Sequence, residues 1–157
     1  MGANLYGEVF TTSDWSTTPR VFQPVSFTAN TILIAARSWF IFYNDPAFTN
    51  LTMEVWTNNA GEPGVLLATS TNTWTKAELI TEDHGFKEIY FKFDQLNMRA
   101  GDTYHFCPKL SGYTGTTSTH VAWKKAFPDP VLSSGLTVTF ESLGGSPYAI
   151  YFIGGEL

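Results

Sequence analysis

His105 and Cys107 are the two side chains whose types and spacing come closest to a chemical constellation. They lie two positions apart in a run of alternating residues, and alternate residues of a β-strand face the same side of a sheet. An imidazole beside a thiol could serve nucleophilic catalysis or supply two metal ligands. A zinc site needs three or four converging ligands, and no further ligand or orienting group accompanies this pair. We therefore expect an ordinary strand pair in which Cys107 is a buried, inert thiol.

Carboxylates offer a second kind of chemistry, because glycoside hydrolysis uses two acidic side chains placed across a cleft. The chain has 14 acidic residues, so such pairs arise by chance in almost any fold. No nucleophile-elbow, phosphate-binding loop or calcium-loop motif is present. We predict a protein that is not an enzyme, with no catalytic residues, no metal centre and no cofactor.

Aromatic side chains are the remaining candidates for a binding function, since they make up 16% of the residues, slightly more than the charged ones. Four lie in or near predicted loops: Trp15, Trp74, Tyr113 and Trp123. An exposed ring can stack on a sugar or form the centre of a protein interface. It can also simply cover the core. These three interpretations stay open for all four residues.

These side chains must be positioned by short segments in which apolar and polar residues alternate. The clearest runs place the following residues on a core face: Leu51, Met53 and Val55; Ile89, Phe91 and Phe93; Tyr104, Phe106 and Pro108. The opposite face of each run is expected to meet solvent. Residues 31–43 are apolar on both faces, which indicates a central strand.

Ten strand candidates follow one another, with turns between them. They cover residues 5–11, 20–27, 31–43, 49–57, 65–70, 86–93, 102–110, 118–127, 135–141 and 147–153. A turn is expected at 58–64 and a short helical turn at 76–79. About eight to ten strands and no long helical period predict an all-β, antiparallel two-sheet jelly-roll sandwich. We expect a single domain over residues 1–157, with residues 1–20 as an N-terminal arm.

The charge pattern argues against two classes of partner. The net charge is −5, and the nine basic residues are scattered, with Lys124 and Lys125 as their only adjacent pair. No basic stripe could therefore follow a nucleic-acid backbone. The longest apolar run is too short, and too interrupted by Arg37 and Ser38, to span a bilayer. The first ten residues lack the pattern of a signal peptide, so we expect synthesis in a cytoplasm and no membrane partner.

Several turns and strand starts occur in a recognisable order. They are Gly61-Glu62-Pro63-Gly64, Ala68-Thr69-Ser70, the aromatic run 86–93, Ala100-Gly101-Asp102-Thr103-Tyr104, Trp123 and Gly154-Gly155. In this order, residues 31–155 resemble the jelly-roll modules, similar to carbohydrate-binding modules and choice-of-anchor type domains, that occur in phage virion proteins and bacterial surface proteins. The motifs are features of turns and core, so they specify a fold and no particular ligand.

The resemblance implies a structural protein of a tailed-phage virion, made in the host cytoplasm. A capsid decoration, or cement, protein that stabilises the head is the most specific expectation. Its partner would be the major capsid protein or another virion protein, and a homo-oligomer, most simply a trimer, would match the threefold positions of a shell. The alternative is a glycan-binding module of a phage tail or an adhesin.

Overall fold

The computed structural model describes residues 7–10, 21–80, 87–114, 119–124, 138–140 and 150–156. Its strands are β1 (Gly7–Phe10), β2 (Gln23–Phe27), β3 (Thr31–Tyr43), β4 (Asn50–Asn59), β5 (Glu62–Thr69), β6 (Trp74–Thr75), β7 (Lys87–Met98), β8 (Thr103–Ser111), β9 (His120–Lys124), β10 (Val138–Phe140) and β11 (Ile150–Glu156). A single turn of helix, α2 (Lys76–Leu79), lies among them, as residues 76–79 predict. No helix in these ranges is long and apolar enough to cross a membrane.

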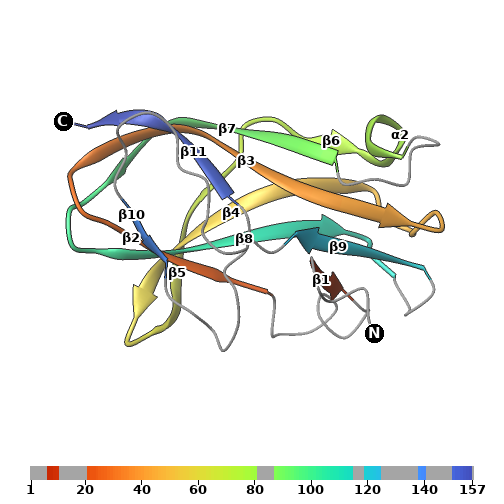
Figure 1. Cartoon of the computed structure of the whole chain (residues 1–157), viewed down its shortest axis with the longest axis horizontal. Coiled ribbons are helices and arrows are strands. Elements are labelled where there is room, and N and C mark those ends of the chain that lie inside the picture. The colour runs from red at the N-terminus through yellow and green to blue at the C-terminus, as the bar shows by residue number, and fades with distance from the viewer. Residues whose placement is uncertain are drawn as a thin grey trace.

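The strands form two antiparallel sheets that pack against each other (Figure 1). In the first sheet, β7 pairs with one edge of β3, and β11 and β9 pair with successive parts of its other edge, with β1 beyond β9. In the second, the order is β10-β2-β8-β4-β5, with β6 pairing the start of β4. The orders β1-β9-β3-β7 and β2-β8-β4-β5, in a chain that crosses between the sheets at most of its connections, are those of a jelly roll. The predicted fold class is confirmed.

The core lies between the sheets and is built by the predicted alternation. Leu51, Met53 and Val55 have no exposed surface, and Phe91 and Phe106 are equally buried. Aromatic rings join the two layers: Phe152 of β11 lies 5.0 Å from Phe106 of β8 and 5.6 Å from Phe27 of β2, measured between ring centroids. Tilted and edge-to-face contacts of this kind add to the free energy gained from burial.

The prediction of a turn over residues 58–64 is wrong. Strand β4 continues to Asn59 and β5 begins at Glu62, so Pro63 and Gly64 lie in a strand. The chain reverses over Ala60 and Gly61 alone, whose φ angles are 52° and 90°. Two positive φ angles in a two-residue loop give the twist that a tight hairpin needs. Proline has no N–H to donate to a neighbouring strand. Pro63 is tolerated because β5 is an edge strand, which needs hydrogen bonds on one side only.

Strand β11 extends beyond its predicted end and pairs with β3 as far as Glu156. The register shifts between Ile153 and Gly154. A Cβ atom added at Gly154 would lie 2.2 Å from the carbonyl oxygen of Ile32, whereas one added at Gly155 would meet nothing within 4 Å. The first of these glycines is therefore required by the close approach of β11 to β3.

Candidate functional site

Trp123 lies in β9 and has no exposed surface. Its ring stacks on Phe40, and its indole Nε1 donates a hydrogen bond to the hydroxyl of Ser38. A side chain in this position presents no platform to a ligand. Its burial supports the core-covering interpretation among the three that the sequence leaves open.

Tyr113 is also part of the core, with 6% of its surface exposed. The backbone N–H of Val121 donates a hydrogen bond to its hydroxyl at 3.1 Å. The adjacent Thr114 bridges to Ala47 across the sheet edge. The sequence places Tyr113 in or near a loop, but its ring packs inward against the core.

Trp74, in β6, is half-buried and packs against the edge of the core. Its Nε1 donates a hydrogen bond of 2.8 Å to the backbone carbonyl of Tyr90 in β7, so its polar atom is used within the fold. Trp15 lies outside the described residues. The three candidates that the structure describes, Trp74, Tyr113 and Trp123, therefore do not form an exposed platform.

We predicted that the outer faces of β4 and β8 meet solvent, but several side chains on these faces are buried. Glu54 and His105 are 2% exposed, and Cys107 is fully buried. The carboxylate of Glu54 accepts a hydrogen bond of 3.0 Å from the Trp56 indole and lies 3.3 Å from Nζ of Lys109. Burying a carboxylate is costly unless it is paired and hydrogen-bonded, and these two contacts supply that pairing.

His105 and Cys107 do share one face, as their spacing predicts. The imidazole Nε2 of His105 lies 2.8 Å from Oδ1 of Asn58, and the Cys107 thiol is directed to the carbonyl of Pro108. In the described ranges, no three His, Cys, Asp or Glu side chains come together in a group that could hold a metal ion. Asp94, one of the 14 acidic residues, is exposed on β7.

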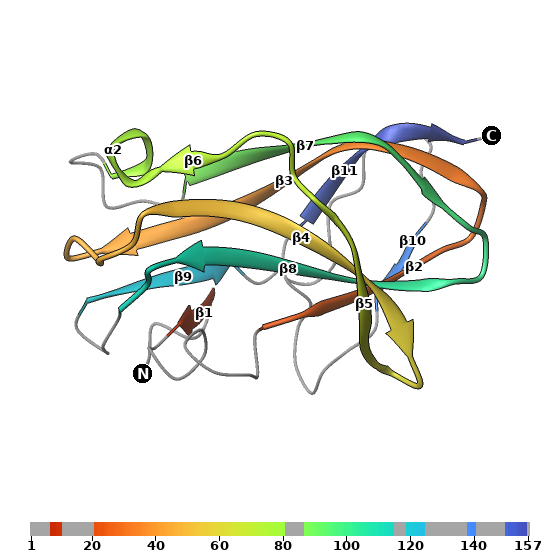
Figure 2. The ribbon, with the colours of Figure 1, turned by 180° about the vertical axis from the view of Figure 1, so that it is seen from behind.

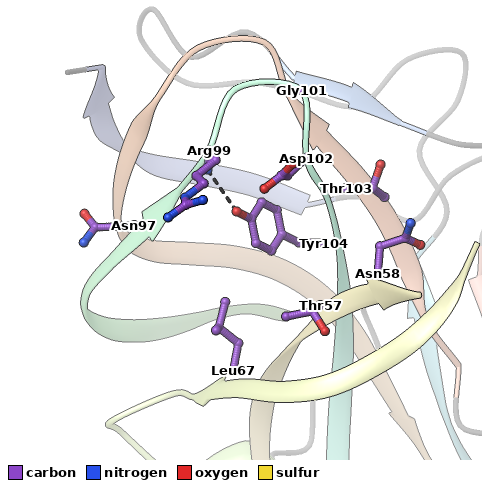
Figure 3. Close-up of a pocket in the computed structure, with 9 residues that line it drawn as sticks. All are labelled: Thr57, Asn58, Leu67, Asn97, Arg99, Gly101, Asp102, Thr103 and Tyr104. Carbon is purple, nitrogen blue, oxygen red and sulfur yellow. Dashed lines mark hydrogen bonds between the residues drawn. The ribbon is translucent and has the colours of Figure 1, made fainter. Parts of the chain in front are cut away.

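An open pocket of about 450 Å³ lies at one end of the sandwich, between the β4–β5 hairpin and the turn that joins β7 to β8 (Figure 3). Arg99 and Asp102 come from the turn, and Tyr104 lies beneath them. Thr57 and Leu67 face them from the hairpin (Figure 3). The rim is completed by the following residues: Asn58, Asn97, Gly101 and Thr103.

A second exposed feature lies on β5, the edge strand of the second sheet among the described strands. Val65, Leu66 and Leu67 are 70%, 43% and 43% exposed. The hairpin that carries them projects at one end of the sandwich (Figure 2). Because successive side chains of a strand point to opposite faces, these three expose apolar surface on both sides of an edge that pairs with no further described strand, and such an edge is suited to a partner. We call Val65–Leu67 the β5 strip.

Neither the pocket nor the β5 strip was identified from the sequence. The pocket draws its residues from three separate segments, and only their register brings Leu67 opposite Tyr104 and Arg99. A signal for the β5 strip was present, because the run Gly64-Val65-Leu66-Leu67-Ala68 does not alternate as a half-buried strand should. A strand that is apolar at successive positions is either covered on both sides or exposes apolar surface.

Comparison of the chain with models of known protein families, with curated proteins and with solved structures finds no match in any of the three.

Proposed function

We propose that this protein is a non-enzymatic structural subunit of a tailed-phage virion, and most specifically a capsid decoration protein that stabilises the head. The observation that carries the proposal is the β5 strip. Edge strands usually carry charges, prolines at hydrogen-bonding positions or covering segments that prevent pairing with another chain. In β5 the charge and the proline, Glu62 and Pro63, stand only at its start, and the exposed apolar side chains that follow are suited to permanent burial in an assembly.

The charge pattern around the strip favours a protein partner. The chain carries a net charge of −5, yet residues 63–75 contain no charged side chain between Glu62 and Lys76. A neighbouring protein can approach this edge without meeting the repulsion that the rest of the surface offers to another acidic surface. The occupant we propose is the major capsid protein of the shell, whose chain would cover the strip.

The resemblance of residues 31–155 to jelly-roll modules of virion proteins supports the same function, and the fold class agrees with it. In this role the subunit binds the assembled shell and not the free capsid protein. Whatever binds only the assembled state shifts the equilibrium toward it by mass action. We expect a homotrimer at the threefold positions of the shell. A closed trimer has a threefold axis of its own, so its three subunits can make equivalent contacts with the three capsid subunits around each position.

Purified heads test the proposal directly. The chain should be found in intact particles at hundreds of copies, and recombinant protein should bind heads that lack it. Leu66→Lys should abolish co-sedimentation with such heads while leaving the thermal midpoint of unfolding nearly unchanged, because the side chain is already 43% exposed. Ile34→Lys is the matched control, since Ile34 is 45% exposed on the other sheet. Absence of the chain from particles, or equal loss of binding in both variants, would refute the proposal.

A further inference from the structure

The pocket at the end of the sandwich is continuous with the β5 strip, because the exposed side chain of Leu67 belongs to both. Figure 3 shows Leu67 on the side of the β4–β5 hairpin, opposite Arg99 and Asp102 of the β7–β8 turn. A partner that covers Leu67 therefore lies directly beside the open mouth of the pocket. The same partner should occupy the strip and the pocket.

Both walls of the pocket are fixed by hydrogen bonds within the fold. On the side of the turn, the N–H of Arg99 donates to the hydroxyl of Tyr104 at 2.9 Å, drawn as a dashed line in Figure 3. On the side of the hairpin, the hydroxyl of Thr57 accepts a hydrogen bond of 2.8 Å from the N–H of Val65. Walls that are already ordered lose little entropy when a partner binds between them.

The polar side chains around the pocket are not used inside the fold. Asn97, Arg99 and Asp102 are exposed, and their side chains make no hydrogen bond or ion pair with another described residue. In the free chain, water can meet these groups. A partner that closes the pocket must replace that water with groups of its own, because a buried polar group left unsatisfied costs free energy.

The two charges in the pocket decide what the partner must offer. The guanidinium of Arg99 can only donate hydrogen bonds, and the carboxylate of Asp102 can only accept them. A single charged side chain placed between them would attract one and repel the other. A peptide group is neutral and carries both an acceptor and a donor, so neighbouring peptide groups can satisfy both residues. Leu67 offers apolar surface beside these groups for a side chain of the same segment.

We propose that a neutral loop of the capsid protein inserts into this pocket. A peptide carbonyl of the loop accepts from Arg99, a peptide N–H donates to Asp102, and an apolar side chain of the loop rests on Leu67. This inference rests on the proposed function and divides its surface into two parts. The β5 strip supplies the apolar area, whereas Arg99 and Asp102 select the partner and fix its orientation, as polar groups at interfaces do.

The first experiment measures the affinity of variants for purified heads that lack the chain, by co-sedimentation. Arg99→Ala and Asp102→Ala should each weaken binding about tenfold or more, because each leaves a buried group of the loop without its charged partner. Neither should lower the thermal midpoint, since both side chains are exposed and make no contact of this kind within the described ranges. Asp94→Ala is the matched control, an exposed acid of β7 that does not line the pocket, and it should bind as the parent does.

A further variant tests the neutrality of the loop. Asp102→Asn keeps an oxygen that accepts from a peptide N–H, so it should bind more tightly than Asp102→Ala. A loss as large as that of Asp102→Ala would show that the partner places a cation there, and would overturn the neutral loop.

The same measurements separate this inference from the proposed function. If the parent binds heads and Leu66→Lys abolishes binding, but Arg99→Ala and Asp102→Ala bind as the parent does, the pocket carries no part of the contact and the inference is wrong while the proposed function stands. If the parent does not bind heads at all, both are wrong.

The second experiment locates the contact by thiol labelling. Cys107 is fully buried, so a maleimide should react chiefly with a thiol introduced at the surface. Asn97→Cys, on the rim of the pocket, should label in the free chain and be protected when the chain is bound to heads. Asp94→Cys is the control and should label in both states. Equal labelling of Asn97→Cys in the free and bound chain, or equal protection of both positions, would contradict insertion at the pocket.

Discussion

The indole ring of Trp123 lies nearly parallel to the phenyl ring of Phe40, with 5.9 Å between the ring centroids and 13° between the planes. The two residues are direct partners in the register of β9 and β3. Ser38, two residues before Phe40, accepts the hydrogen bond of the indole. One side chain thus fixes β9 to the central strand by stacking and by a hydrogen bond.

Replacing Trp123 should destabilise the fold strongly. Trp123→Ala removes a fully buried ring, and truncations of this kind cost about 3–5 kcal/mol. The free energy of unfolding, measured by urea denaturation, checks this value. Trp39→Ala is the comparison, because Trp39 is only half-buried on the other face of β3, and its loss should be clearly smaller. Equal losses would show that Trp123 is not the ring that holds β9.

Two adjacent glycines of β11 should respond differently to the same substitution. The added methyl group of Gly154→Ala meets the backbone of Ile32, which cannot rotate away as a side chain can, so we expect a loss of about 2–3 kcal/mol. Gly155→Ala places its methyl group in open space and should change the free energy of unfolding by less than about 0.5 kcal/mol. The two midpoints in urea give the comparison, and similar values for both would contradict the close approach of β11 to β3.

The β4–β5 hairpin should become more stable when its turn receives a residue suited to positive φ. Ala60 has a φ of 52°, a conformation that costs an ordinary residue about 1–2 kcal/mol. Asn tolerates it, and Asn-Gly is the preferred pair for this turn. Ala60→Asn should therefore raise the free energy of unfolding by roughly 0.5–1 kcal/mol. Ala100→Asn, in a turn where this residue has ordinary φ, should give no gain, and a gain there instead would contradict the assignment.

Much of the fold could be predicted because its signals are local. Alternation predicts the buried faces around Met53, Phe91 and Phe106, and the segment at residues 76–79 predicts the helical turn. The hairpin was misplaced because Pro63-Gly64 has the composition of a turn. The actual reason for Gly64 is steric, since a Cβ atom there would lie 2.7 Å from the hydroxyl of Thr57, and that depends on the register of a neighbouring strand.

The candidate site could not be predicted for a related reason. Arg99 and Asp102 flank an unremarkable Ala-Gly turn, and nothing in their segment indicates that Leu67 lies opposite. Burial of Glu54 was equally hidden, because an acidic residue on the polar face of an alternating strand normally meets water. Its partners Trp56 and Lys109 come into reach only through the strand pairing. Local pattern therefore determines the core and marks the β5 strip, whereas the pocket depends on pairing between distant segments.

The carboxyl group of Glu78 in α2 should titrate at a lower pH than an ordinary glutamate. Its carboxylate accepts hydrogen bonds from the backbone N–H and then from the hydroxyl of Thr75, at 2.7 and 3.0 Å, and these bonds lower the pKa of Glu78. Because the folded pKa lies below the unfolded one, the stabilising effect is complete above the ordinary glutamate value of about 4.3 and is lost as the pH falls through the folded pKa. A carboxyl NMR titration should show this depression. Thr75→Val removes the hydroxyl but keeps the backbone donor, so the pKa should rise only part of the way. A complete return to the ordinary value would contradict the dominance of the backbone bond.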